Sequence, residues 1–226
     1  MKSYPGHKKI NGVFHKIINE IPVHKVYYEL FAGTAAIAKL IKGTGVKLVL
    51  NDIDRSVTDK LNCIPGITAT ITTIPATNIL EKLIKSAAGT DVFVFLDPPY
   101  LHSTRPNSTK LYKYEMVDRE HIQLLSTALQ LKCNCMIIHP KCELYDNMLS
   151  SWRKVEIKVR YHGKTSIECL YMNYGAPDAL QSDLYLGKDC WDRQRIKRKA
   201  ERIVDKFDRL PVLERNYVLK LLKEKY

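Results

Sequence analysis

Short apolar runs alternate along the first two thirds of the chain with stretches in which apolar residues recur every three or four positions. The runs predict buried strands, and the recurring spacing predicts helices with one buried face. We expect strands at residues 26–31, 46–50, 67–73, 92–96 and 133–138. We expect helices at 35–41, from the end of the second strand to about residue 63, and at 76–88, 117–131 and 143–151. This alternation predicts an α/β fold with a mostly parallel sheet and helices on both faces.

The remaining segments frame this alternation. A helix is expected from about residue 9 to residue 20, and Pro22 ends it. Residues 153–161 and 165–174 alternate in polarity around 162–164 and predict a long hairpin. The pattern from 188 to 226 is helical, with a break at Leu210 and Pro211. Because the composition changes at Pro177, we expect a first domain over 1–177 and a basic helical extension over 178–226.

Basic residues outnumber acidic residues in this 226-residue chain, whose net charge is +12. The tail from residue 188 supplies half of that excess, with thirteen Lys or Arg against seven Asp or Glu. Such an excess favours a polyanionic partner, with nucleic acid ahead of a membrane surface, over a basic protein that is merely soluble. No run reaches the ~18–20 apolar residues of a membrane span. Since the N-terminus also lacks an apolar signal core, we expect a cytoplasmic protein without a membrane partner.

The spacing of cysteines and histidines does not indicate a metal site. The six cysteines are scattered, and Cys133-Asn134-Cys135 has the wrong spacing for a zinc knuckle, with no second pair to face it. The seven histidines show no metal-ligand spacing either. We therefore expect no bound metal and interpret the cysteines as reduced, mostly buried thiols.

Candidate ligand-binding residues follow the first two predicted strands, where open α/β sheets bind ligands. The strand at 26–31, the turn Ala32-Gly33-Thr34 and the helix at 35–41 are arranged as in the first half of a Rossmann-like unit. Because the turn has only small side chains, a ligand can approach its backbone. There is no G-x-G-x-x-G, which favours a cofactor without a pyrophosphate over a dinucleotide. Asp52 or Asp54, at the end of the second strand, either accepts hydrogen bonds from ribose hydroxyls or caps the next helix. Both interpretations stay open.

Asp97-Pro98-Pro99-Tyr100 follows the apolar strand at 92–96. Neither proline can donate a hydrogen bond to a neighbouring strand, so the strand must end here. Asp97 is therefore expected at the ligand-binding edge of the sheet, at the end of a central strand. The alternative is a strand end followed by a rigid turn with no chemical role.

Basic residues gather in two further places. The polar loop at 101–116 is long for a compact domain, which is more typical of a functional loop than of an idle connection. The tail crowds arginines and lysines between residues 193 and 202. As candidate nucleic-acid contacts we take Arg105, Lys110, Tyr112, Lys113, Arg195, Arg198 and Arg202. The alternative for the tail is a helix that packs on the domain through Ile196, Ile203, Val204 and Phe207.

Four motifs occur in a definite order: Tyr4-Pro5-Gly6-His7-Lys8, Glu29-Leu30-Phe31-Ala32-Gly33-Thr34, Asn51-Asp52-Ile53-Asp54 and Asp97-Pro98-Pro99-Tyr100. With the loop at 110–116 and the hairpin, this order resembles the Dam-like, adenine-specific class of DNA N6-methyltransferases. More narrowly, it is similar to the compact phage and prophage members. Two departures are evident: only about 45 residues separate Asp52 from Asp97, which leaves no room for an inserted recognition domain, and His7 stands where a second glycine is usual.

The resemblance implies a Rossmann-like methyltransferase fold, in which the hairpin supplies an antiparallel strand and the helical tail is added. It also implies S-adenosylmethionine as the methyl donor. The residues implied to bind it are Tyr4, Gly6, Lys8, Glu29, Phe31, Ala32, Gly33, Thr34, Asp52, Ile53 and Asp97.

The catalytic residues implied are Asp97, Pro98, Pro99 and Tyr100. The Asp97 carboxylate and the Pro98 carbonyl would accept the two hydrogens of the adenine N6 amine. The ring of Tyr100 would stack on a base that has left the duplex.

The implied function is a DNA adenine N6-methyltransferase that acts on duplex DNA, and a monomer is favoured. An RNA adenine N6-methyltransferase is an alternative, because it could share every catalytic residue. A cytosine N4-methyltransferase is disfavoured, because its motif more often begins with Ser than with Asp. The last alternative is a basic nucleic-acid-binding protein with an inactive methyltransferase fold. Without a recognition domain, we expect weak or short sequence preference.

Overall fold

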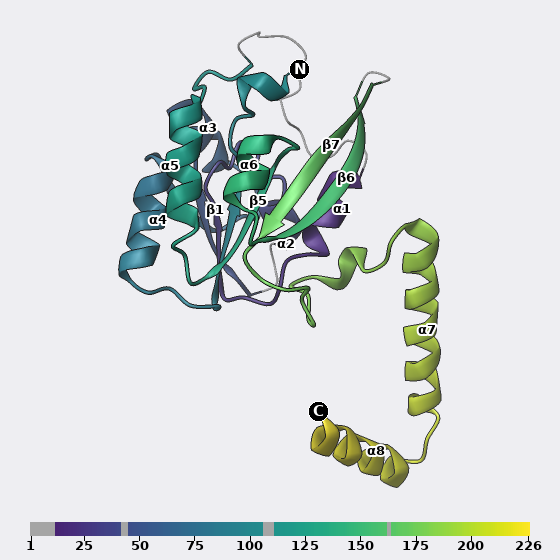
Figure 1. The fold of residues 1–226 in the computed structure, drawn as a ribbon. Helices are drawn as coiled ribbons and strands as arrows, with labels where there is room; N and C mark the ends of the chain where they lie inside the picture. Colours follow the sequence, from purple (N-terminus) through teal and green to yellow (C-terminus); the bar gives the residue numbers. More distant parts are fainter. Residues whose placement is uncertain (1–11, 42–44, 106–110, 162–163) are drawn as a thin grey trace. The chain divides into compact units, whose positions relative to one another are not determined.

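The computed structural model describes residues 12–41, 45–105, 111–161 and 164–226. Its described strands are β1 (Val26–Glu29), β2 (Lys47–Asn51), β3 (Ala69–Thr72), β4 (Val92–Leu96), β5 (Asn134–Pro140), β6 (Arg153–Tyr161) and β7 (Lys164–Met172) (Figure 1). Its α-helices are α1 (Val13–Ile18), α2 (Ala38–Ile41), α3 (Arg55–Leu61), α4 (Ala76–Lys85), α5 (Asp118–Ala128), α6 (Glu143–Met148), α7 (Cys190–Asp208) and α8 (Val212–Lys225). The described residues also form the short 3-10 helices His102–Thr104 and Asp183–Tyr185.

The described strands form one sheet in the order β3-β2-β1-β4-β5-β7-β6. The first five pair in parallel, whereas β7 runs antiparallel to both β5 and β6. The prediction of a mostly parallel sheet with a C-terminal antiparallel hairpin is therefore confirmed. β4 lies beside β1, with Val26 opposite Val92, so the strand before Asp97 is central, as expected.

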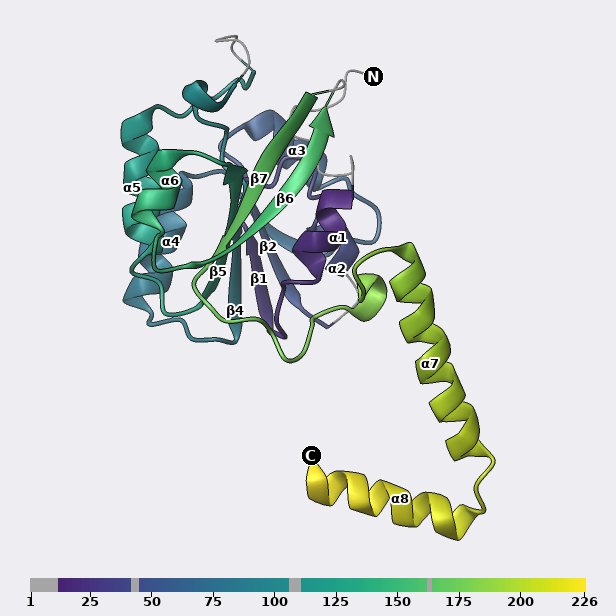
Figure 2. The same cartoon turned by 45° about the vertical axis from the view of Figure 1, so that its right-hand side comes forward.

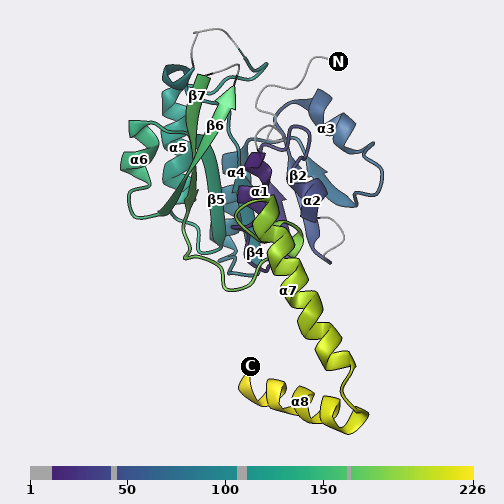
Figure 3. The same cartoon turned by 90° about the vertical axis from the view of Figure 1, so that its right-hand side faces the viewer.

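Helices cover both faces of this sheet. α4, α5 and α6 lie on one face, and α1, α2 and α3 lie on the other (Figures 2 and 3). This division follows from the right-handed crossovers that connect parallel strands, because the chain changes direction along the sheet between β3 and β4. Both faces of the central strands are thus buried.

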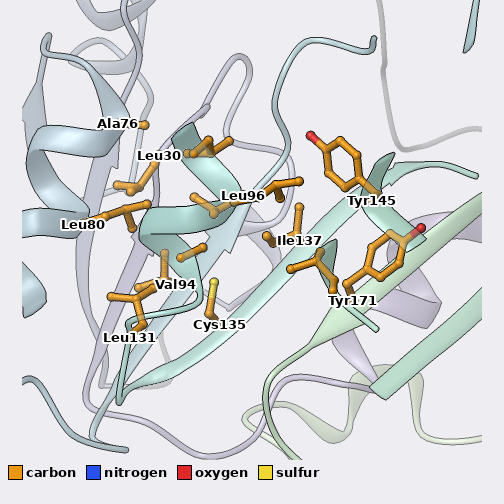
Figure 4. Close-up of a cluster of buried hydrophobic side chains, with 14 of the residues drawn as sticks. Leu30, Ala76, Leu80, Val94, Leu96, Leu131, Cys135, Ile137, Tyr145 and Tyr171 are labelled. Atoms are coloured by element: carbon orange, nitrogen blue, oxygen red, sulfur yellow. The ribbon is translucent and has the colours of Figure 1, made fainter. Parts of the chain in front are cut away.

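The burial of β4 explains its apolar sequence. Phe93 and Phe95 point to one face and Val94 and Leu96 to the other, and all four side chains are buried. Val94 and Leu96 pack with neighbouring strands and with α4 in the hydrophobic core drawn in Figure 4. The core extends to Tyr145 and Tyr171, whose rings are fully buried.

One helix begins later than the sequence pattern predicts. The apolar pattern predicts a helix from residue 35, but α2 starts at Ala38. Ala35 has a φ of 52°, in the left-handed region that a helix cannot contain. The residues between Ala32 and Ala38 therefore form a longer turn.

The chain divides into two compact units, Met1–Ser182 and Asp183–Tyr226. Residues 178–182, grouped with the tail in the sequence interpretation, belong to the first unit. The Gln181 amide donates to the Ile21 carbonyl, and Leu180 forms an isolated bridge with Pro22. The domain boundary at 177 stays a prediction.

The second unit contains α7 and α8, separated at Pro211. Asp189 caps α7 by accepting a hydrogen bond from the Asp192 amide. Neither helix, both of which lie within the described residues 164–226, contains a buried residue. Among the described residues, no helix combines the length and apolar composition that crossing a membrane requires.

Candidate active site

A cleft of about 410 Å³ lies at the carboxyl ends of β1, β2 and β4. Its wall is formed by the turn after β1, the turn after β2, the start of α4, the residues after β4, the segment before α5, and one face of α5. The described residues that line it are Glu29, Phe31, Ala32, Gly33, Thr34, Ala36, Ile37, Asp52, Ile53, Asp54, Pro75, Ala76, Thr77, Phe95, Asp97, Pro99, Tyr112, Lys113, Tyr114, Glu115, Met116, Glu120, Gln123 and Leu124.

The turn after β1 is held in place by Asp52. One carboxylate oxygen of Asp52 accepts the Gly33 amide at 3.0 Å, and the other accepts the Asp54 amide at 2.9 Å. Gly33 has a φ of 49°, which glycine adopts readily. Burial is the main cause that raises the pKa of Asp52. Asp52 thus fixes the backbone at the point where a ligand would approach it.

Asp54 has the capping role that the sequence left open between the two carboxylates. Its side chain accepts the Ser56 amide at 2.9 Å and caps α3. Asp54 also accepts a hydrogen bond from the Lys113 ammonium at 2.9 Å, and this bond is the main cause that lowers its pKa. Asp52 therefore does not cap α3.

Asn51 ties the ends of three strands together, a role that sequence periodicity could not indicate. Its amide nitrogen donates to the Leu30 and Ile74 carbonyls at 3.0 and 2.9 Å. Its oxygen accepts the Thr72 hydroxyl at 2.8 Å and the Ile74 amide at 3.2 Å. The buried side chain is thus bonded at both its nitrogen and its oxygen and stabilises the floor of the cleft.

Glu29 ends β1 and is buried. Its carboxyl group accepts the Ala38 amide at 2.9 Å and the Tyr27 hydroxyl at 3.2 Å. Burial raises the pKa of Glu29 to about 8, and the nearby charge of Asp97 adds to the shift. Near neutral pH the side chain is therefore mostly a neutral acid.

The segment after β4 places Asp97 and Pro99 in the cleft wall. Asp97 is half-buried and Pro98 is buried. Tyr100 does not line the cleft but contacts Tyr112, which does, with ring centroids 6.5 Å apart. The Tyr100 hydroxyl donates to the buried Glu168 carboxylate of β7 at 2.9 Å.

Residues 111–116 form a segment, which we call the strap, along one side of the cleft. Glu115 fixes the conformation of the strap, because its carboxylate accepts the Leu111 and Tyr112 amides of the same segment at 2.7 and 2.9 Å. The same carboxylate forms an ion pair with Arg105 at 2.6 Å. The Arg105 hydrogen bond is the largest cause that lowers the pKa of Glu115 to about 2. Lys113 joins the strap to the turn after β2 through Asp54.

Arg105 is placed differently from the expectation that it contacts a phosphate. Its side chain is only 1% exposed and donates to the Tyr100 carbonyl as well as to Glu115. The reason is that Glu115, ten residues later, folds back onto it and supplies the counter-charge. Arg105 thus connects the strap to the segment after β4.

The structure brings together most of the residues predicted from the sequence. Every described residue predicted to bind the cofactor lines the one cleft: Glu29, Phe31, Ala32, Gly33, Thr34, Asp52, Ile53 and Asp97. Two predicted nucleic-acid contacts, Tyr112 and Lys113, line the same cleft. Tyr4, Gly6, Lys8 and Lys110 lie outside the described residues. Arg195, Arg198 and Arg202 belong to α7 in the second unit.

Several lining residues were missed by the sequence interpretation. Pro75, Ala76 and Thr77 follow the third strand, where the carboxyl-end rule could have pointed to them. Glu120, Gln123 and Leu124 lie on one face of α5 by helical spacing, but nothing in the pattern says which element that face meets.

Negative charge dominates the described wall of the cleft. The carboxylates that line it are Asp52, Asp54, Asp97, Glu115 and Glu120, beside Glu29, which is mostly neutral near neutral pH. Lys113 is the one Lys or Arg among the described lining residues. This is the reverse of the balance of the whole chain, whose net charge is +12. A small ligand that carries positive charge suits such a wall.

The fold and the cleft define an open α/β protein with a cleft at the point where the strand order reverses, which is where such sheets bind ligands. Residues 67–163 match the family model of the D12 class N6 adenine-specific DNA methyltransferases. The resemblance to adenine-specific DNA methyltransferases is therefore confirmed over this part of the chain, which contains Asp97-Pro98-Pro99-Tyr100 and the strap. The narrower likeness to phage and prophage members stays a prediction.

The solved structures to which the chain is similar share little sequence with it. A SAM-dependent methyltransferase from Agrobacterium tumefaciens is 12% identical, with a TM-score of 0.46 over 71% of this chain and 60% of that one. The chain thus spans about 60% of the length of that protein. Magnesium protoporphyrin IX methyltransferase from Synechocystis PCC 6803, solved with bound SAM, is 11% identical, with a TM-score of 0.43 over 71% of this chain and 75% of that one. The curated protein sequences gave no match.

Proposed function

We propose that the protein is an S-adenosylmethionine-dependent methyltransferase that modifies the N6 amine of adenine in DNA. The observation that carries the proposal is the position of Asp97-Pro98-Pro99-Tyr100. This motif ends a central strand beside an acidic cleft, inside the segment that matches the D12 class family model.

The cleft suits the donor in size and charge. About 410 Å³ falls within the range of about 300–1,000 Å³ for small-molecule sites. The donor's positively charged sulfonium supplies a reactive methyl group when it is bound. The acidic wall favours that charge, the Ala32 to Thr34 turn leaves room at the backbone, and Asp52 retains lone pairs for ribose hydroxyls beyond its two amide bonds.

The task of the motif residues is to orient the target amine. The adenine N6 lone pair is delocalised into the ring, so the amine is a weak nucleophile. Asp97 accepts one N6 hydrogen and the Pro98 carbonyl accepts the other, which favours a more tetrahedral nitrogen aimed at the methyl group. Pro99 restricts Pro98 to an extended conformation and so fixes the direction of that carbonyl. Tyr100 offers a ring on which the extruded base stacks.

The first test is whether the chain methylates adenine in DNA. The protein is expressed in a host that lacks adenine methylation, and the host DNA is sequenced by a method that detects N6-methyladenine. We expect modified adenine with the wild type and none with Asp97→Ala at equal protein level. Asp91→Ala is the matched control, because Asp91 is an exposed aspartate next to the other end of β4 and should leave methylation unchanged.

A purified assay separates the substrates. Methyl transfer from labelled donor is measured on duplex DNA and on structured RNA in competition. Preferred transfer to RNA would replace the DNA assignment with the RNA alternative. Normal methylation by Asp97→Ala would overturn the assignment of the motif.

We infer that DNA is held mainly through phosphates, by the arginines of α7. Arg195, Arg198 and Arg202 lie on one face of α7 by helical spacing, and Arg195 also pairs with Asp192 at 2.7 Å. Phosphate contacts give affinity without sequence information, so the expected sequence preference is weak or short, about two to four bases.

Changing the three α7 arginines to Gln should lower affinity about equally on all DNA sequences. It should also flatten the salt dependence of binding by ~0.9 per lost phosphate contact. The matched control removes the same charge from α8 with Arg215→Gln, Lys220→Gln and Lys223→Gln. Equal effects of the two triple variants would show that only net charge matters. A lower melting temperature with an unchanged salt slope would show that α7 merely braces the fold.

A further inference from the structure

Three hydrogen bonds hold Tyr100 and the residue after it, and two of them come from strands far away in the sequence. Its hydroxyl donates to Glu168 of β7 at 2.9 Å, and its carbonyl accepts the Arg105 guanidinium. The next amide, that of Leu101, donates to the Nε2 atom of His139 on β5 at 3.1 Å. The His139 ring also meets the Tyr100 ring edge-on, with centroids 5.6 Å apart. The residue therefore has a defined orientation before any ligand binds.

His139 is itself fixed. A backbone amide can only donate, so His139 Nε2 accepts, and the proton of the neutral ring lies on Nδ1. Nδ1 then donates to the Pro140 carbonyl at 2.8 Å. The ring stacks on Tyr145 at 3.9 Å, and the Tyr145 hydroxyl lies 2.8 Å from His121 Nδ1. Rigid, buried side chains thus stand behind Tyr100.

Glu168 is an acidic residue buried among apolar neighbours, which is unusual. The side chain is 1% exposed on β7, and the neighbours on its own face of the strand include the apolar Leu170 and Met172. Its partner in the β6 pairing is Ile157. A carboxylate in apolar surroundings is unfavourable unless it is hydrogen-bonded, so a packing role alone would be served better by an apolar residue.

We propose that Glu168 is a positioning residue for methyl transfer: through its hydrogen bond to the hydroxyl, it holds the Tyr100 ring at the angle required to stack the target base. This inference rests on the proposed function. Glu168 acts on the reaction through its hydrogen bond to Tyr100. The hairpin of β6 and β7 thereby contributes to the reaction, although Glu168 lies 68 residues after Tyr100 in the sequence.

The kinetic test is a double-mutant cycle of Tyr100→Phe and Glu168→Leu. Each change removes the same hydrogen bond and keeps the ring or the volume. A hydrogen bond to a charged group corresponds to about a 10- to 100-fold change in rate. We expect kcat to fall by that factor in each single variant and no further in the double variant. KM for DNA should stay within about twofold. Glu168→Gln should keep most activity, because its amide oxygen still accepts the bond.

Three kinetic outcomes would overturn the proposal. They are a normal kcat for Glu168→Leu, additive losses in the double variant, and a loss that disappears when the variants are assayed well below their melting temperatures. Normal kcat of Glu168→Leu beside a large loss in Tyr100→Phe would mean that the hydroxyl acts directly on substrate.

A second measurement needs no activity. Protein labelled with ¹³C in the tyrosine rings is compared by NMR, and Tyr100→Phe assigns the Tyr100 signals. We expect Glu168→Leu to shift the signals of Tyr100 and to speed its ring flips, while Glu168→Gln restores them in part. Unchanged Tyr100 signals in Glu168→Leu would refute the positioning role. If the wild type methylates no nucleic acid, the proposed function fails, and the NMR comparison still decides whether Glu168 fixes Tyr100.

Discussion

Glu29→Gln should change how the stability of the protein depends on pH. Glu29 is buried at the floor of the cleft, where it binds the Ala38 amide and the Tyr27 hydroxyl. Burial and the nearby Asp97 raise the pKa of Glu29 from an ordinary 4.5 to about 8. Gln has the shape of the neutral acid and its oxygen can still accept the Ala38 amide. The variant therefore isolates the effect of the charge.

The sign and the size follow from linkage. A raised carboxyl pKa means that the folded state favours the protonated form, so the stabilisation is complete below pH 4.5 and is lost as the pH rises to about 8. In this window the wild type should lose about 1.4 kcal/mol relative to Glu29→Gln for each pH unit. Between pH 5 and pH 7 the difference amounts to about 3 kcal/mol.

Urea unfolding of both proteins at pH steps from 4.5 to 8.5 measures this difference. Glu81→Gln, an exposed glutamate of α4, is the matched control and should run parallel to the wild type. Parallel curves for the wild type and Glu29→Gln would refute the argument, because they would show that burial does not hold Glu29 neutral.

Calorimetry with S-adenosylmethionine in buffers of different ionisation enthalpy adds a second test. A bound cation lowers the pKa of Glu29, so binding near pH 7.5 should release a proton in the wild type and not in Glu29→Gln.

Two further carboxylates give predictions from their contacts. Asp52→Ala leaves the Gly33 and Asp54 amides without the oxygens that bind them, so it should lower the free energy of unfolding by about 1.5–3 kcal/mol and weaken donor binding. Urea unfolding measures the first effect and calorimetry the second. If neither value changes, Asp52 has no role in stability or in donor binding. The pKa of Glu115 is lowered to about 2 by Arg105, so the stability from this carboxylate is present above pH 4.5 and is lost as the pH falls towards 2. Acid unfolding of Glu115→Gln should therefore lack this loss, and equal acid slopes in both proteins would contradict the ion pair.

The sequence was sufficient to predict the sheet because the apolar runs of the central strands leave little choice. A run such as 92–96, apolar at every position, fits a strand buried on both faces and little else. With strands and crossovers placed, the carboxyl-end rule brings Gly33, Asp52 and Asp97 to one edge. The cleft then follows from connectivity, before any side chain is placed.

What the sequence could not predict depends on side chains that meet across long distances. No periodicity pairs Tyr100 with Glu168, or turns Arg105 inwards onto Glu115. The late start of α2 follows from the left-handed Ala35, a conformation that alanine rarely adopts and that no residue pattern signals. Local patterns determine elements, whereas these contacts are set by tertiary packing.

The strand order also determines which sheet edges could pair between two molecules of the protein in concentrated solution. Its outer strands are β3, which has four residues, and β6, which has nine. An uncovered edge can pair with another chain, and charged side chains discourage this. β6 carries Lys154, Glu156, Lys158 and Arg160 at alternate positions. Replacing these charges with valine would turn a protected rim into a template for edge-to-edge aggregation.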